Sequence, residues 1–202
     1  MKASICIVPF RNNKRFLEIF KQIKQTIGEY EIIVIDNNAR DDLRKLMTGV
    51  KYFHNKNKGK LAGATNKAVN MAEGRYFVYV CAIHTRIYSN DWLSDMIKQM
   101  MANPKYAMGG DLRPFGSKGH IQGGVYIAKI NWMRKNPYDE VKAPFTFMDV
   151  HISKRVLATG GKLLKIRSVY SSMTGWSVKN HVQNRQLKKF KIVHSHEVYN
   201  YK

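Results

Sequence analysis

The sequence predicts a single α/β domain, in which a mostly parallel β-sheet carries helices on both faces. Short apolar runs rich in β-branched residues alternate with amphipathic segments as far as residue 101, and such alternation is typical of a parallel sheet. The chain has 202 residues, 44% of them hydrophobic, which is enough for one core. No linker, internal repeat or low-complexity segment divides it, so we expect one domain.

The elements of the first half follow two patterns. Residues 4–10 form a continuous apolar run, as in a strand buried on both faces. Residues 14–27 predict a helix, because Phe16, Phe20 and Ile23 recur at helical spacing and Gly28 ends the pattern. The same patterns then alternate as strand 31–36, short helix 40–47, strand 50–55, helix 61–73, strand 75–83 and helix 90–101, with Asn90 or Asp91 as its N-cap.

The second half is less regular. It contains a strand at 123–130, a helix at 147–158, a strand at 161–166 and an alternating segment at 187–199. Each of these elements is predicted from its own periodicity. Periodicity does not predict the order of the strands in the sheet.

The charge of the chain is extreme. It carries 35 Lys and Arg against 14 Asp and Glu, a formal net charge of +21. Residues 151–202 hold eleven of the basic side chains and one acid, Glu197. Such an excess favours a polyanionic partner, namely nucleic acid, an anionic membrane surface or a phosphate-rich substrate. A solvated basic surface without a partner stays open as the alternative.

Several classes of protein are excluded. No apolar run approaches the roughly 20 residues of a membrane-spanning helix, and the first ten residues are poorly flanked for a signal peptide. Cys6 and Cys81 both lie inside apolar runs, which excludes a disulfide framework or a zinc ribbon. Two buried thiols suit a reducing compartment, and we expect the cytoplasm.

The ligand site is expected beyond the carboxyl ends of the parallel strands, where open α/β sheets bind their ligands. Loops 9–12, 36–38, 57–60 and 82–85 fall there. They bring an acid, Asp36, a basic helix entrance suited to a diphosphate, and a histidine. A turn-capping role for Asp36 and solvated lysines are the structural alternatives. The glycine-rich signatures of dinucleotide-binding folds and P-loops are absent, which disfavours nicotinamide cofactors and ATP-dependent phosphoryl transfer.

Six segments, taken in order, resemble the GT-A glycosyltransferases of family 2 over residues 4–166. They are IVPFRNN, EIIVIDNNARDD, NKGKLAGATNKAV, AEGRYFVYV, SNDWLSDM and FMDVHISKRVLATGGKLLKI. The resemblance implies a Rossmann-like GT-A sheet, with a nucleotide-sugar-binding half at 1–101 and an acceptor-binding half at 102–202 that ends in the basic segment. It implies transfer of a hexose or pentose from a nucleotide-sugar, expected to be a UDP-sugar, to a hydroxyl group with inversion.

The resemblance also implies roles by position. The nucleotide-sugar would be bound by Pro9, Phe10, Arg11, Asp36, Asn38, Lys58, Lys60, Asn66 and Ile83. Of these, Pro9, Phe10 and Asp36 would hold the nucleobase, while Lys60 and Asn66 would lie near the ribose or phosphates. Asp149 matches the second acid of the family's acidic pair and would be the general base that deprotonates the acceptor. Its position also suits a helix N-cap, and the two roles are compatible.

The metal motif of the family, Asp-x-Asp, is replaced here by Ala82-Ile83-His84. Three accounts stay open. His84 binds a divalent metal, Mn²⁺ or Mg²⁺, together with His194 or His196 of a His-x-His pair. Basic residues stabilise the leaving diphosphate without a metal, the candidates being Lys58, Lys60, Arg113 and Lys118. In the third account the chain is catalytically inactive and only binds its ligands. Asp111 is a candidate to replace the lost carboxylate.

The acceptor is predicted from the C-terminal quarter, which interleaves basic residues with Tyr170, Trp176, Phe190, Tyr199 and Tyr201. This pattern suits phosphate contact with base stacking, although aromatics at such spacings also pack cores. The candidate acceptor or phosphate contacts are Asp111, Arg113, Lys118, Lys188 and Lys189. We predict a hydroxymethylated pyrimidine in DNA, as in some bacteriophage enzymes, which would act in the host cytoplasm. The alternatives are a cell-surface polysaccharide or lipid-linked acceptor, and a catalytically silent nucleic-acid-binding protein. No oligomeric state is predicted.

Overall fold

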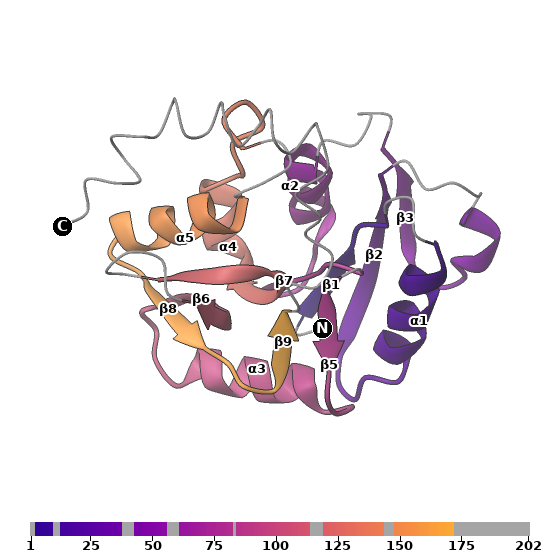
Figure 1. The fold of residues 1–202 in the computed structure, drawn as a ribbon, viewed down its shortest axis with the longest axis horizontal. Helices are drawn as coiled ribbons and strands as arrows, with labels where there is room; N and C mark the ends of the chain where they lie inside the picture. Colours follow the sequence, from indigo (N-terminus) through magenta and orange to yellow (C-terminus); the bar gives the residue numbers. More distant parts are fainter. Residues whose placement is uncertain are drawn as a thin grey trace.

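A seven-stranded sheet with the strand order β3-β2-β1-β4-β7-β6-β8 forms the centre of the computed structural model (Figure 1). The structure describes residues 3–9, 13–37, 43–55, 61–82, 84–113, 119–143 and 148–171. A separate pair of short strands, β5 (Thr85–Ile87) and β9 (Val169–Ser171), runs antiparallel beside it.

The first half of the sheet is parallel. β1 (Ala3–Ile7) lies between β2 (Tyr30–Asp36) and β4 (Tyr76–Val80), and β3 (Lys51–His54) pairs with the outer side of β2. Every residue of β1 and β4 is buried, since helices cover both faces. The continuous apolar runs seen in the sequence are the consequence.

One strand of the large sheet runs against the others. β7 (His120–Lys129) is antiparallel to both β4 and β6 (Tyr106–Arg113), and β8 (Lys162–Lys165) is parallel to β6. β6 therefore points the same way as β1 and β4, and its carboxyl end lies at the same edge as theirs. The start of β7 lies at this edge too.

Helices cover the sheet on both sides, as predicted. α1 (Asn13–Lys24) and α3 (Trp92–Met101) pack on one face, against Ile5 and Ile7 of β1. On the other face, α2 (Leu61–Met71), α4 (Ile130–Lys135) and α5 (Met148–Ala158) share a core with Cys6. In Figure 1, α3 lies below the sheet and α4 and α5 lie above it. None of the helices in the described ranges combines the length and apolar character that crossing a bilayer requires.

Most predicted elements are confirmed with shifted ends. The helix at 14–27 ends at Lys24, the strand at 75–83 ends at Val80, and the strand at 123–130 begins earlier, at His120. Within the segment at 40–47, Arg44–Leu46 form a single 3-10 turn. Asp91 does precede α3, but its side chain makes no capping hydrogen bond. The alternating segment at 187–199 lies outside the described residues.

The prediction missed β5, β6, α4 and β9. β6 reads YAMGGDLR, and two glycines disfavour a strand. The structure has glycine there because of close packing. A Cβ on Gly109 would lie 2.8 Å from Ile166 Cδ1, and one on Gly110 would lie 2.7 Å from Ile121 Cγ2. Tertiary contact, rather than local preference, makes this segment a strand.

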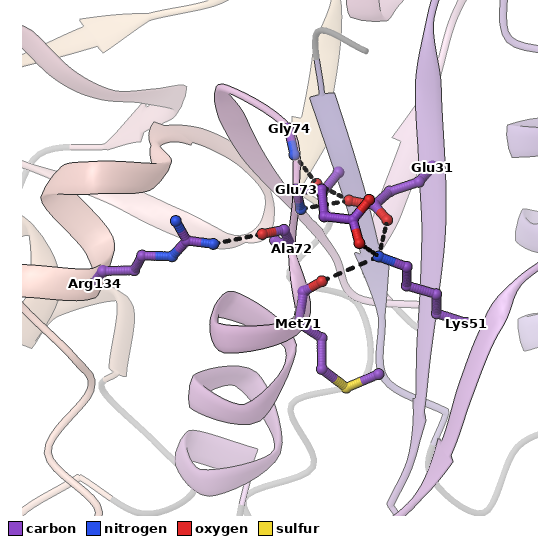
Figure 2. Close-up of polar contacts among 8 residues, drawn as sticks. Glu31, Lys51, Met71, Ala72, Glu73, Gly74 and Arg134 are labelled. Atoms are coloured by element: carbon purple, nitrogen blue, oxygen red, sulfur yellow. Dashed lines mark hydrogen bonds and ion pairs between the residues drawn. The ribbon is translucent and has the colours of Figure 1, made fainter.

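A charged network closes the sheet edge opposite the predicted ligand site (Figure 2). Oε1 of Glu31 accepts hydrogen bonds from Ser4 Oγ at 2.5 Å and from the N–H of Glu73 at 2.6 Å. Lys51 Nζ lies 2.8 Å from Glu31 Oε2 and 2.5 Å from Glu73 Oε1. These contacts tie the connection between α2 and β4 to the starts of the neighbouring strands.

Candidate active site

The carboxyl ends of the first three strands meet, as predicted for the ligand edge. The N–H of Asn37 donates to the carbonyl of Pro9 at 3.2 Å, and the N–H of Asn55 donates to the carbonyl of Asp36 at 2.7 Å. The side-chain amide of Asn55 also donates to Asn37 Oδ1 at 2.9 Å. These bonds place Pro9 and Asp36, both predicted to contact the nucleobase, on adjoining loops.

Asp36 is held by the edge strand β3. Its side chain is only 5% exposed, and its Oδ2 accepts a hydrogen bond from Tyr52 Oη at 2.6 Å. Nδ1 of His54 lies 3.2 Å from the same oxygen and donates to it when protonated. Because a buried carboxylate needs such donors, Tyr52 and His54 fix the orientation of the acid at the end of β2.

Asn66 makes three bonds within the protein. From α2, its amide N–H groups donate to the carbonyl of Tyr138 at 3.0 Å and to Glu140 Oε1 at 2.9 Å. Its Oδ1 accepts from the N–H of Tyr138 at 2.8 Å. A contact of Asn66 with the ribose or phosphates stays a prediction, and it would have to compete with these bonds.

Asp149 lies in the first turn of α5, half-buried. Its Oδ2 accepts from the N–H of Gly123 at 2.9 Å, and its Oδ1 accepts from the N–H of Val150 at 2.9 Å. Burial raises the pKa of this carboxyl above its ordinary value, while the nearby His120 and the two backbone N–H groups oppose the rise. Asp149 is therefore a fixed carboxylate whose proton affinity exceeds that of an exposed aspartate.

The turn that carries His84 lies against β7, the strand that contains Gly123. The carbonyl of Gly124 accepts from the N–H of Cys81 at 2.7 Å and from Thr85 Oγ1 at 2.6 Å. Within the turn, the N–H of His84 donates to the carbonyl of Cys81 at 3.2 Å. The position of the lost metal motif and Asp149 thus attach to adjacent residues of β7.

A third cluster lies at the end of β6. Oδ2 of Asp111 accepts from Arg113 Nε at 3.0 Å, from Arg113 Nη2 at 2.7 Å and from the N–H of Ser171 at 3.2 Å. The guanidinium of Arg113 also lies 5.0 Å from the ring centroid of Tyr170. Hydrogen bonds with Tyr170 and Asp111 raise the pKa of Arg113 above its ordinary value. Arg113 is thus a permanent, partly exposed cation held in one orientation.

The described part of the chain contains no group of three or more His, Cys, Asp or Glu side chains that could hold a metal ion. Asp111, the candidate replacement for the lost carboxylate, has one oxygen committed to Arg113 and Ser171. A metal site that includes His84 would therefore need ligands beyond the described residues.

Residues 4–157 match the family model of glycosyl transferase family 2. The chain belongs to this family. An uncharacterized glycosyltransferase of Rickettsia conorii is 31% identical over 86 residues, which make up 39% of this chain and 14% of that protein. The chain therefore spans a small fraction of this curated relative.

Solved structures share the fold. A mannosyltransferase of Pyrobaculum calidifontis in complex with GDP-Man and Mn²⁺ matches with a TM-score of 0.75 and 13% identity, over 100% of this chain and 65% of that one. Glucosyl-3-phosphoglycerate synthase of Mycobacterium tuberculosis, in complex with Mn²⁺, UDP and phosphoglyceric acid, matches with a TM-score of 0.72 and 10% identity, over 96% of this chain and 78% of that one. The GT-A sheet predicted from the six segments is confirmed.

Many of the predicted site residues lie outside the described ranges. They are Phe10, Arg11, Asn38, Lys58, Lys60, Ile83, Lys118, Lys188, Lys189, His194 and His196. Their roles stay predictions. Most of the described ones form two groups. Pro9 and Asp36 lie at one end of the sheet edge, and around β6 and β7 lie His84, Asp149, Asp111 and Arg113. Asn66, on α2, is bonded to Tyr138 and Glu140 and belongs to neither group.

Sequence reasoning about this family 2 chain missed the groups that hold the acids. Tyr52 and His54 contact Asp36 because β2 and β3 pair in register, with Asp36 opposite His54. The available signal was a pair of polar side chains, Tyr52 and His54, at alternate positions of a short strand. Gly123 was missed as well, although paired glycines inside a strand indicate a close approach by another group.

Proposed function

We propose that this family 2 chain transfers a sugar from a nucleotide-sugar, with UDP-sugars as the first candidates, to a hydroxyl group with inversion. One observation carries the proposal. The half-buried carboxylate of Asp149 and the turn at the position of the metal motif are hydrogen-bonded to consecutive residues, Gly123 and Gly124. The reaction needs a base that deprotonates the acceptor hydroxyl and a loop that binds the leaving diphosphate. Asp149 and the turn with His84 would supply these two parts.

The donor would bind across residues 1–101. Asp36, oriented by Tyr52 and His54, would accept a hydrogen bond from a pyrimidine N–H, with Pro9 beside the base. Structures that share the fold hold GDP-Man or UDP, which supports a nucleotide-sugar.

Transfer would occur in one displacement. Asp149 takes the proton of the acceptor hydroxyl as its oxygen forms a bond to the anomeric carbon. The bond between that carbon and the diphosphate oxygen breaks on the opposite face, and the nucleoside diphosphate leaves with the electron pair. Attack from the opposite face inverts the anomeric centre. The raised pKa of Asp149 favours this role, because a stronger base removes the proton more readily.

The charge of the leaving diphosphate would be balanced by a divalent metal, Mn²⁺ or Mg²⁺. We propose His84 as one ligand and His194 or His196 as another. The basic residues Lys58, Lys60, Arg113 and Lys118 are the alternative, and a chelation experiment separates the two.

For the acceptor, we propose a hydroxymethylated pyrimidine in DNA. The net charge of +21 and the oriented Arg113 beside Tyr170 support a polyanion whose bases can stack. A cell-surface polysaccharide or lipid-linked acceptor is the second candidate, since most enzymes of the family act on such substrates. A protein that binds nucleic acid without turnover is the third.

The test is a transfer assay with a panel of UDP-sugars, with and without Mn²⁺. The acceptors are unmodified DNA and DNA carrying 5-hydroxymethylcytosine or 5-hydroxymethyluracil, with mass spectrometry of the digested nucleosides. A hexose or pentose mass shift on the modified base alone supports the DNA acceptor. Hydrolysis of a UDP-sugar without any shift overturns it in favour of a glycan or lipid acceptor.

Asp149→Asn tests the assignment of the base. It should abolish transfer while leaving UDP binding unchanged. The matched control is Asp91→Asn, since Asp91 also begins a helix but is exposed, and its side chain makes no capping bond. Full activity in Asp149→Asn would overturn the mechanism, and lost activity in Asp91→Asn would show that the assay reports folding.

A further inference from the structure

Two neighbouring glycines of β7, Gly123 and Gly124, each hold a different part of the candidate site. The N–H of Gly123 donates to Asp149 Oδ2 at 2.9 Å. The carbonyl of Gly124 accepts from Cys81 N and Thr85 Oγ1, at the two ends of the turn that carries His84. One dipeptide therefore sets the separation between the acid and the turn.

Space, and not backbone conformation, favours glycine at both positions, more strongly at Gly124 than at Gly123. The glycines with left-handed φ in the described ranges are Gly28, Gly49, Gly119 and Gly160, so neither residue of the pair needs an unusual φ. A Cβ on Gly123 would lie 3.1 Å from Asp149 Oδ2 and 3.3 Å from Asp149 Cβ and Cγ. A Cβ on Gly124 would lie 2.5 Å from Ser171 Oγ. Gly123 alone has the acid as its neighbour.

We propose that Gly123 is a positioning residue for the transfer reaction, orienting Asp149 through its N–H and through the space left by its missing side chain. This inference rests on the proposed function of Asp149. It goes further by assigning the orientation of the base to the sheet. The other backbone donors to Asp149 among the described residues, the N–H groups of Val150 and of Asp149 itself, belong to its own helix.

The position of Gly123 also bears on the proton affinity of the acid. Among the described residues, the charged and titratable groups that interact with Asp149 are His120 on β7, Tyr79 on β4 and Tyr138 after α4. The backbone N–H groups of Val150, Gly123 and Asp149 itself lower the pKa of Asp149 against the effect of burial. Lengthening the bond to Gly123 should therefore move the acid limb of the kcat profile to higher pH.

The test is Gly123→Ala. Its new Cβ forces Asp149 to move by a few tenths of an ångström, so kcat should fall about tenfold. The Kd for UDP should not change, and the acid limb should shift upward. Gln122→Ala is the control from the same strand and should keep the kcat and pH profile of the wild type. A wild-type kcat and pH profile in Gly123→Ala, alongside an inactive Asp149→Asn, would overturn the role of Gly123. Full activity in Asp149→Asn would instead overturn the proposed function.

A second measurement does not depend on a variant. In the wild-type protein, the amide ¹⁵N and ¹H resonances of Gly123 should titrate with the same midpoint as the acid limb of kcat, because this N–H donates to the ionising carboxylate. The resonances of Gln122 provide the comparison. A Gly123 amide that does not respond across the acid limb contradicts the proposal even where Gly123→Ala fails to fold.

Discussion

Replacing Glu31 by alanine should lower the free energy of unfolding by about 3 kcal/mol. The substitution leaves three groups without their acceptor, namely Ser4 Oγ, the N–H of Glu73 and the ammonium of Lys51. The side chain of Glu31 is 8% exposed and that of Lys51 is 35% exposed. Ser4 Oγ and the N–H of Glu73 both donate to Glu31 Oε1. Figure 2 shows Lys51 and the backbone at Glu73, in the connection after α2, beside the carboxylate of Glu31.

The magnitude follows from the kind of each contact. A hydrogen bond to a charged group contributes about 1.5–3 kcal/mol, and two such bonds sharing one oxygen are not additive. The ion pair with the partly exposed Lys51 is screened and adds at most about 1 kcal/mol. A loss of about 3 kcal/mol should lower the Tm by about 6–12 °C in a chain of this size.

The pH dependence has a definite sign. Burial would raise the pKa of Glu31, but hydrogen bonds from Lys51, Ser4 and the Glu73 N–H lower it overall. The stabilisation is therefore present above the ordinary pKa of a glutamate, about 4.3, and is lost as the pH falls through the lowered value. The pKa of Lys51 is raised, chiefly by its bonds to Glu31 and Glu73, so its share is lost only as the pH rises above about 10.4.

Urea unfolding of the wild type, Glu31→Ala, Glu31→Gln and Glu73→Gln at pH 7 and pH 3 provides the assay. Glu73 is 67% exposed, so Glu73→Gln should cost less than about 0.5 kcal/mol. Glu31→Gln should lie between that control and Glu31→Ala, since its amide oxygen still accepts from Ser4. A loss below 1 kcal/mol in Glu31→Ala, or an equal loss at both pH values, would refute this account of the network.

Three further predictions concern the site. Tyr52→Phe removes a donor to Asp36 and should raise the Kd for UDP about three- to tenfold, as measured by calorimetry; an unchanged Kd would show that Tyr52 does not orient the acid. If transfer requires Mn²⁺, as proposed, His84→Ala should raise the Mn²⁺ concentration for half-maximal transfer at least about tenfold; an unaltered requirement, or wild-type transfer after chelation, would exclude His84 as a ligand. The acid limb of kcat should lie above the ordinary aspartate pKa of about 3.9, because burial raises the pKa of Asp149; a limb at or below that value would contradict the assignment of the base.

The sequence was sufficient for the parallel half of the fold because burial on both faces leaves a local signal. Ile5 and Ile7 face one layer and Cys6 and Val8 face the other, so the run is apolar throughout. β6 gave no such signal, since Gly109 and Gly110 are required by side chains of Ile166 and Ile121 from elsewhere in the chain. Contacts of that kind are visible only once the strands are placed.

The same distinction applies to the site. Asp36 was predicted because a polar residue at the end of a parallel strand is a local feature with a known place in the fold. The contacts of Tyr52 and His54 depend on the register between β2 and β3, which no local pattern specifies. The interaction of Arg113 with Tyr170 joins residues far apart in sequence. The periodicity of the sequence does not predict this contact either.

The reversed direction of β7 explains why the second half of the chain contributes residues to the same edge of the sheet. Val125 pairs with Val80, the last residue of β4, so Gly123 and Gly124 lie just beyond the end of β4, where the turn with His84 begins. A parallel β7 would have brought its beginning to the opposite edge, far from Asp36. Running antiparallel, it places the N–H that holds Asp149 beside the carbonyl that holds the turn. The one strand that departs from the parallel order thus joins the parallel strands of the first half to the helix that carries the proposed base.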